Sequence, residues 1–139
     1  MTHVSKNALT QEKQRELFEQ LHKVIARLNK SHTPAFLNEL LGEEEKIMLA
    51  KRLAAIVLYI EGNSSYRVWT LLKISPSTAD RIRLNYQIGR YNAIQKFITG
   101  NRTEYARILK TLEAILQAGL PPRGRGRWKR TLKNLTRTE

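Results

Sequence analysis

Apolar residues recur along this chain at intervals of three and four residues, and this spacing constrains the fold more than any other feature. Such residues share one face of an α-helix, and that face must be buried against another element. The spacing predicts an all-α fold of about six helices. The clearest stripes are Leu17, Phe18, Leu21, Val24, Ile25 and Leu28 near the start, and Tyr105, Ile108, Leu109, Leu112, Ile115 and Leu116 near the end. Both are long enough to build a dimer interface, and both could equally close a monomeric core.

Glycine, proline and capping residues set the expected helix boundaries. Thr33 and Pro34 are typical of an N-cap followed by a first helical residue, and Gly62 is typical of the residue after a helix end. The predicted helices cover about 11–29, 34–41, 43–61, 65–72, 76–89 and 103–118, with a short helical stretch at about 91–98. The inward residues of the third helix are predicted to be Ile47, Met48, Leu53, Ile56, Val57 and Ile60.

The composition changes near residue 119. We predict one helical domain over residues 1–118 and a flexible basic tail over 119–139. The tail carries Glu139 as its one acidic residue against Arg123, Arg125, Arg127, Lys129, Arg130, Lys133 and Arg137. Its arginines are expected to bind phosphates or to enter a minor groove, and the alternative is a tail that only aids solubility. Trp128 is expected to stack on a base or to enter a lipid interface.

The formal net charge is +13, from 25 Lys and Arg against 12 Asp and Glu. This excess predicts a polyanionic partner, either nucleic acid or an acidic membrane surface. The chain has no Cys, which excludes disulfides and thiolate metal sites and fits a reducing compartment. The longest apolar stretch, residues 53–60, is too short to span a bilayer. The N-terminus lacks the apolar run of a signal peptide, so we expect a soluble, cytoplasmic protein that is associated with the nucleoid.

The sequence argues against an enzyme. It contains no phosphate-binding glycine loop, no zinc-protease motif and no cysteine nucleophile. Asp80 is its only aspartate and its three histidines are scattered, so no metal cofactor is expected.

Residues 65–82, within a segment of about 64–88, have the layout of a helix-turn-helix: a short helix, a turn at 73–75 and a second helix. Ser75 and Pro76 are typical of the start of the second helix, and Lys73 occupies the turn position that usually holds glycine. The apolar residues needed to pack the two helices together are Val68, Leu72, Ile74, Ala79 and Ile82. Together with the charge, this layout predicts binding to double-stranded DNA through the major groove.

Candidate DNA contacts follow from this geometry. Residues at the start of the second helix are expected to face bases or nearby phosphates, and the arginines that follow are expected to contact phosphates. The first helix is expected to cross the DNA backbone. Asp80 would repel phosphate unless it accepts from a cytosine amino group or pairs with an arginine. For each residue, a solvated surface is the alternative. The candidates are Arg67, Thr70, Ser75, Ser77, Thr78, Asp80, Arg81 and Arg83, with Arg123, Arg125, Arg127, Lys129 and Arg130 from the tail.

Four segments together resemble the Trp repressor family of bacterial regulators: residues 36–41, 49–53, 61–66 and 74–81. The resemblance covers about residues 33–90. It implies an intertwined helical homodimer that binds palindromic operators and represses transcription.

Tryptophan-binding members of that family hold the indole ring between two arginines, and Arg52 and Arg81 fall at the matching positions. The alternative for both is surface solvation or phosphate contact. Two departures argue against tryptophan as a cofactor: Ile82 replaces a glycine that leaves room for the ring, and Gly42 replaces a threonine. Our hypothesis is therefore DNA binding without tryptophan, which saturable binding in calorimetry with L-tryptophan would overturn.

Two other classes of protein fit the same charge. An RNA-binding or nucleoid-associated protein would bind nucleic acid without reading its sequence. A helical adaptor would bind an acidic protein and show only weak duplex affinity that salt abolishes. A sequence reader differs from both because it prefers one duplex over scrambled duplex at physiological salt.

Overall fold

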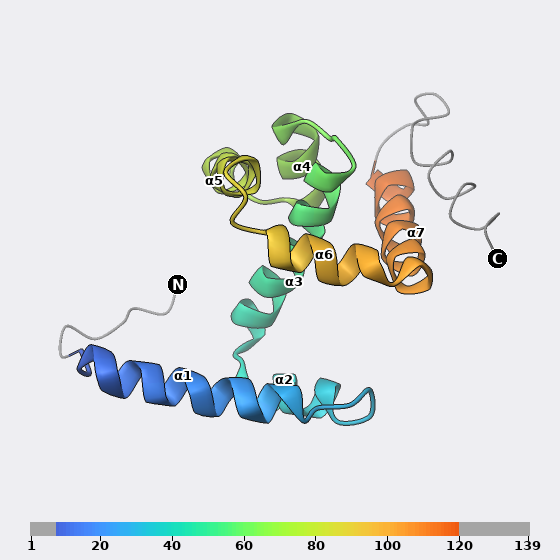
Figure 1. Ribbon diagram of the computed structural model, residues 1–139. Coiled ribbons are helices and arrows are strands. Elements are labelled where there is room, and N and C mark those ends of the chain that lie inside the picture. Colours follow the sequence, from blue (N-terminus) through green and yellow to red (C-terminus); the bar gives the residue numbers. More distant parts are fainter. Residues whose placement is uncertain (1–7, 120–139) are drawn as a thin grey trace. The chain divides into compact units, whose positions relative to one another are not determined.

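The computed structural model describes residues 8–119, and all regular structure in this part of the chain is helical (Figure 1). This confirms the all-α prediction, with seven helices where about six were expected. They are α1 (Gln11–Ala26), α2 (Thr33–Leu40), α3 (Glu43–Ile60), α4 (Ser65–Leu72), α5 (Pro76–Gln87), α6 (Asn92–Gly100) and α7 (Arg102–Gly119).

Serine side chains start the two short central helices. Ser64 Oγ accepts a hydrogen bond from the backbone N–H of Arg67 at 3.3 Å, and Ser75 Oγ accepts from the N–H of Thr78 at 3.1 Å. Each bond satisfies an amide that a helix leaves without an internal partner. The predicted cap at Ser75 is confirmed, and of the two candidates for α4 the cap is Ser64.

Glycines in the left-handed region end α3 and α5. Gly62 has φ 81° and Gly89 has φ 84°, a conformation that costs glycine little. Asn63 N–H donates to Leu58 O at 3.0 Å and Gly62 N–H to Tyr59 O at 3.0 Å, the paired bonds of a Schellman motif. The role predicted for Gly62 is confirmed.

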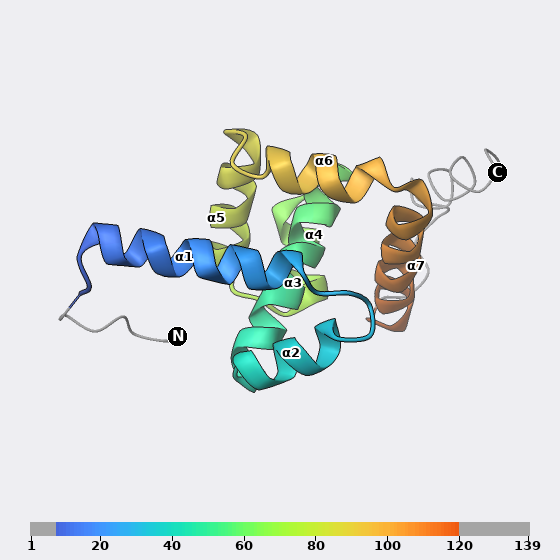
Figure 2. The same ribbon diagram turned by 60° about the horizontal axis from the view of Figure 1, so that its bottom comes forward.

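Two predicted boundaries near the N-terminus are wrong. Helix α1 ends at Ala26 rather than near Asn29, whose side-chain oxygen instead accepts from the N–H groups of Ser31 at 3.1 Å and His32 at 3.0 Å. Thr33 is the first residue of α2 and not its cap, because its hydroxyl donates to Asn29 O at 2.7 Å. Asparagine competes for backbone groups in this way and closes the turn between α1 and α2 (Figure 2).

The chain divides into two compact units, with the boundary between Met48 and Leu49. The described part of the first unit holds α1, α2 and the first turns of α3, and none of its residues is buried. The prediction that Ile47 and Met48 point into a core is wrong, since they are 46% and 40% exposed. This unit presents its apolar stripe rather than enclosing it.

The second unit has a core built from four of its helices. Helix α3 contributes the continuous run from Ala55 to Tyr59, which is buried on all sides. The other buried residues are Val68 and Leu72 of α4, Ala79 and Ile82 of α5, and Tyr105, Leu109, Leu112 and Leu116 of α7. Two predicted core residues, Leu53 and Ile115, are exposed instead, at 40% and 44%.

Helix α7 is tied to the end of α3 by a hydrogen bond. The Tyr105 hydroxyl donates to Glu61 Oε1 at 2.5 Å, and Tyr105 itself is 6% exposed. Burial, followed by this hydrogen bond, raises the pKa of Tyr105 above its usual value. Within residues 8–119, no helix combines the length and apolar character needed to cross a membrane.

The turn between α4 and α5 contains a left-handed residue that carries a side chain. Lys73 has φ 52° and ψ 49°, and it is the one non-glycine residue of the described chain with positive φ. The sequence predicted this role for Lys73. The conformation places Cβ close to the following carbonyl oxygen and costs about 1–2 kcal/mol.

Replacing Lys73 with glycine should therefore stabilise the fold. We expect Lys73→Gly to raise the free energy of unfolding by about 1 kcal/mol, because relief of the left-handed strain exceeds the added entropy of the unfolded chain. Urea unfolding followed by circular dichroism measures the change. Lys73→Ala is the control, since it removes the charge and keeps the Cβ. An equal gain in both variants would show that the lysine charge, rather than the backbone, destabilises the turn.

Candidate nucleic-acid interface

Helices α4 and α5 form the predicted helix-turn-helix, joined by residues 73–75. The Ile74 N–H donates to Trp69 O at 3.3 Å, which closes the end of α4. Lys51 of α3 donates from its ammonium to Lys73 O at 3.3 Å. Helix α3 therefore contacts the turn directly, and the half-buried Ile74 packs against the core below it.

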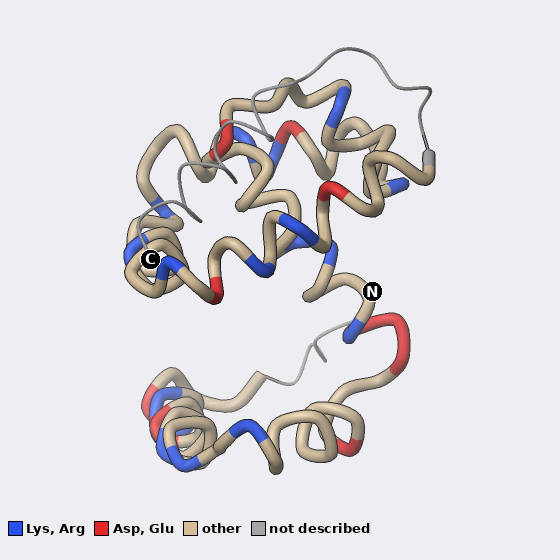
Figure 3. The backbone as a smooth tube through the Cα atoms, turned by 90° about the vertical axis from the view of Figure 1, so that its right-hand side faces the viewer, with Lys and Arg blue, Asp and Glu red and all other residues tan. Residues whose placement is uncertain are grey.

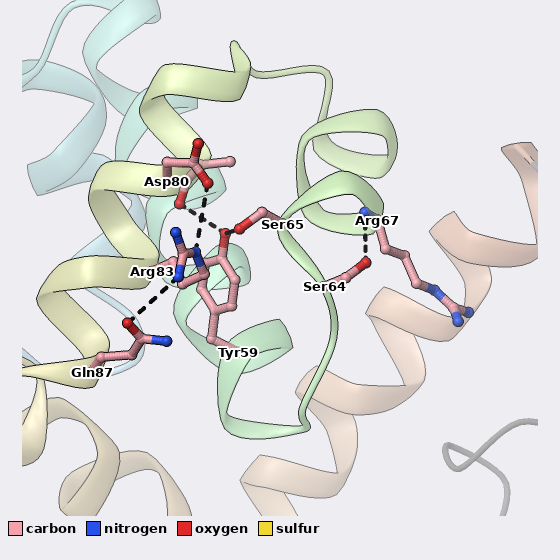
Figure 4. A network of polar contacts seen from close by, with 8 residues as sticks. Tyr59, Ser64, Ser65, Arg67, Asp80, Arg83 and Gln87 are labelled. Carbon is pink, nitrogen blue, oxygen red and sulfur yellow. Dashed lines mark hydrogen bonds and ion pairs between the residues drawn. The ribbon is translucent and has the colours of Figure 1, made fainter.

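Tyr59 of α3 connects the two helices of this motif (Figure 4). Its hydroxyl donates to Ala79 O of α5 at 2.8 Å and lies 3.1 Å from Ser65 Oγ of α4. A carbonyl oxygen can only accept, so the one phenolic hydrogen goes to Ala79 and the Ser65 hydroxyl donates to the tyrosine oxygen. One side chain thus fixes α4 and α5 to α3.

The surroundings of Tyr59 keep it neutral. Its side chain is 5% exposed, and its ring stacks on that of Tyr86 with centroids 6.4 Å apart and planes at 18°. Burial raises the pKa of Tyr59 above 10.0, and the charge of Asp80 acts in the same direction, while the Ser65 hydrogen bond and Arg83 oppose it. Sequence reasoning missed this residue, although a tyrosine inside the apolar run 53–60 was a signal that its hydroxyl needs a partner.

The hydroxyl groups at the start of α5 contact one another. Ser75 Oγ lies 2.7 Å from Thr78 Oγ1, to which it donates, and 3.1 Å from Ser77 Oγ. Ser75 and Thr78 are therefore engaged in the cap, and Thr78 is half-buried. Ser77 is exposed beside them and is the short polar side chain best placed to approach a base edge.

The charge of Asp80 is paired within α5. Arg83 Nε lies 3.5 Å from Asp80 Oδ1, and a terminal nitrogen of Arg83 donates to Gln87 Oε1 at 3.5 Å (Figure 4). The Asp80 and Arg83 side chains are 53% and 38% exposed, so water weakens the pair. Pairing with an arginine is one of the two conditions under which Asp80 does not repel a nearby phosphate, and the Arg83 contact meets it.

The structure separates the two candidates on α4 from those on α5. The Arg67 side chain extends toward α7, away from Asp80 and Arg83 (Figure 4). The Thr70 hydroxyl donates back to Tyr66 O at 2.7 Å and is half-buried. Of the α5 candidates, Ser77, Asp80 and Arg81 are exposed and Thr78 and Arg83 are half-buried, whereas Arg67 belongs to a different side of the motif.

The two arginines at the positions that match the tryptophan-binding pair lie at the surface. They are Arg52 on α3 and Arg81 on α5, and both are exposed. Ile82 is 4% exposed and belongs to the core, where it packs the helix-turn-helix. The tail candidates Arg123, Arg125, Arg127, Lys129 and Arg130, together with Trp128, lie outside the described residues.

Positive charge is concentrated in the unit that holds the helix-turn-helix (Figure 3). Residues 49–119 contain eleven Lys and Arg against four Asp and Glu, whereas residues 8–48 contain six against seven. Residues 49–119 therefore carry a net charge of +7 (11 − 4), which favours a polyanionic partner for this part of the chain.

Comparison of this chain with protein-family models, curated proteins and solved structures finds no match. Among residues 8–119, no group of three or more His, Cys, Asp or Glu side chains lies close enough together to hold a metal ion.

Removing the Tyr59 hydroxyl should loosen the helix-turn-helix. We expect Tyr59→Phe to lower the free energy of unfolding by about 1 kcal/mol, because two hydrogen bonds are lost while the ring remains. The pKa of Tyr59 is raised in the folded state, so this contribution is present below about pH 10 and is lost as the pH rises through the folded value. The difference between the variant and the natural protein should therefore narrow at alkaline pH.

Urea titrations at pH 7 and above pH 10 test this expectation. Tyr66→Phe is the matched control, since Tyr66 is 68% exposed and the substitution removes the same atom. Equal stability of Tyr59→Phe and the control at pH 7 would contradict the role assigned to the Tyr59 hydroxyl.

Proposed function

We propose that this protein is a sequence-specific DNA-binding regulator of transcription, of the repressor type, that reads the major groove with α5. The observation that carries the proposal is the helix-turn-helix itself: two short helices, a left-handed turn at Lys73, and a direct attachment to α3 through Tyr59. It lies in the more basic unit of the described chain.

The dimensions and the exposed side of α5 suit this role. An α-helix with side chains is about 10–12 Å wide, and the major groove is about 12 Å wide. Ala79 and Ile82 face the core, which leaves Ser77, Asp80 and Arg81 on the outer side. At the start of α5, Pro76 has no N–H and the N–H of Thr78 is bonded to Ser75 Oγ, which leaves the N–H of Ser77 to face a phosphate.

We propose that binding requires no tryptophan. In the resembling family a glycine after the second arginine leaves space for the indole ring. Here Ile82 occupies that position and packs in the core with 4% of its surface exposed. An effector of another kind is compatible with this proposal.

We further propose that the protein binds DNA as a homodimer, with the first unit providing the contact. Residues 8–48 are close to electrically neutral, so two copies of this unit do not repel each other strongly. Helix α1 has no buried residue, and its apolar stripe is open to a partner. The exposed members of the stripe are Leu17, Phe18, Leu21, Val24 and Ile25.

Selection of random duplex DNA on the purified full-length protein, at roughly physiological salt, tests the function. A two-fold dimer places its reading helices about 34 Å apart, so we expect an enriched palindrome with half-sites about one helical turn apart. Retention of all duplexes or of RNA without enrichment would favour the general nucleic-acid binder. Duplex affinity that disappears at physiological salt would favour the adaptor.

Arg81→Ala should weaken binding to the enriched duplex by about tenfold or more, since a well-placed arginine contact contributes about 1–3 kcal/mol. Arg107→Ala is the matched control, because Arg107 is an exposed arginine on α7 and its loss changes the net charge equally. Fluorescence anisotropy measures both affinities. Equal losses would show that only total charge matters and would contradict a specific contact between α5 and the duplex.

Leu21→Glu should convert the dimer to a monomer at micromolar concentration. The substitution places a carboxylate in the α1 stripe, where burial against a second copy would require its desolvation. Ala26→Glu adds the same charge elsewhere on α1 and should leave the dimer intact. Light scattering coupled to size exclusion gives the mass of each. A monomeric natural protein, or equal behaviour of the two variants, would contradict the proposed interface.

A further inference from the structure

One large apolar side chain lies exposed on the outer side of α5. Leu84 is 52% exposed, although the core side of the same helix is occupied by Ala79 and Ile82. Leu84 lies four residues after Asp80 and three residues after Arg81, so it is next to both on the helix surface. It follows Ser77 by seven residues, which is about two turns. Leu84 therefore continues the line of residues proposed to face the bases.

The surroundings of Leu84 favour a nucleic acid as its occupant. Arg81 is exposed on the same side of the helix, and the neighbouring Asp80 is paired with Arg83. A protein partner would have to cover the Arg81 charge together with the leucine, whereas DNA offers that arginine a phosphate. The major groove also presents one apolar group, the 5-methyl of thymine, which aliphatic side chains contact.

We propose that Leu84 contacts a thymine 5-methyl group in each half-site and makes the protein select thymine at that position. This inference rests on the proposed reading role of α5. Residues one turn apart on a helix have Cβ atoms about 5–6 Å apart, and successive base pairs are about 3.4 Å apart. The selected thymine therefore lies within about two base pairs of the base nearest Arg81.

Deoxyuridine, which differs from thymidine by the methyl group alone, gives a direct test. Each thymine of the enriched half-site is replaced in turn, symmetrically in both half-sites, and affinity is measured by anisotropy. Removing one buried methyl group corresponds to about fourfold weaker binding per contact. We expect this loss at one position. Leu84→Ala should bind the thymine duplex more weakly and show no further loss with deoxyuridine at that position.

Ile88→Ala is the matched control, because Ile88 is 67% exposed at the end of α5 and lies one turn beyond Leu84. It should keep the sensitivity to deoxyuridine. Circular dichroism and light scattering establish that both variants keep the helix content and mass of the natural protein. Leu84 is exposed, so its truncation leaves the core intact.

The outcomes separate this inference from the proposed function. No enriched duplex would overturn both. An enriched duplex without thymine in its half-sites, or one that tolerates deoxyuridine throughout, would overturn the role of Leu84 and leave sequence reading in place. A Leu84→Ala variant that changes mass while keeping the sensitivity to deoxyuridine would assign Leu84 to a protein interface and overturn the inference.

Discussion

The hydroxyl of Tyr59 is the contact on which the helix-turn-helix depends. It gives its hydrogen to Ala79 of α5 and takes one from Ser65 of α4, so three helices meet at one buried oxygen. Apolar packing of Ala79 and Ile82 sets which side of α5 faces the core. The directional bond to a backbone carbonyl adds a fixed point near the start of α5 and restrains the helix further.

Local signals were sufficient to predict the helix-turn-helix from sequence. Ser75 and Pro76 marked the start of α5, Gly62 marked the end of α3, and Lys73 had to take the left-handed position because no glycine was available. These features depend on a few neighbouring residues and their backbone groups. Tyr59 was missed because its partners, Ser65 and Ala79, lie on two other helices and come within reach only once the helices pack.

Helical periodicity predicted burial only in part. Ile47 was expected to face a core, yet it is 46% exposed, and Leu21 and Ile115, from stripes that suit either a core or a dimer interface, are 36% and 44% exposed. Helical spacing states which face is apolar, but it does not state what covers that face. Periodicity likewise gave no orientation for the candidate residue Arg67 relative to α5.

Ser75 and Gly89 cap the two ends of α5, and the helix is attached to the core by the Tyr59 hydrogen bond and by the buried Ala79 and Ile82. A helix that is well capped and packed in this way has little freedom to adjust its position to an imperfect surface. If α5 enters a groove, the duplex must supply most of the adjustment by bending or changing groove width. The energy of that deformation depends on base steps that the protein never touches, with pyrimidine–purine steps yielding most easily. A rigid α5 would then make the affinity depend on the DNA sequence between the two half-sites, although the protein does not contact those base pairs.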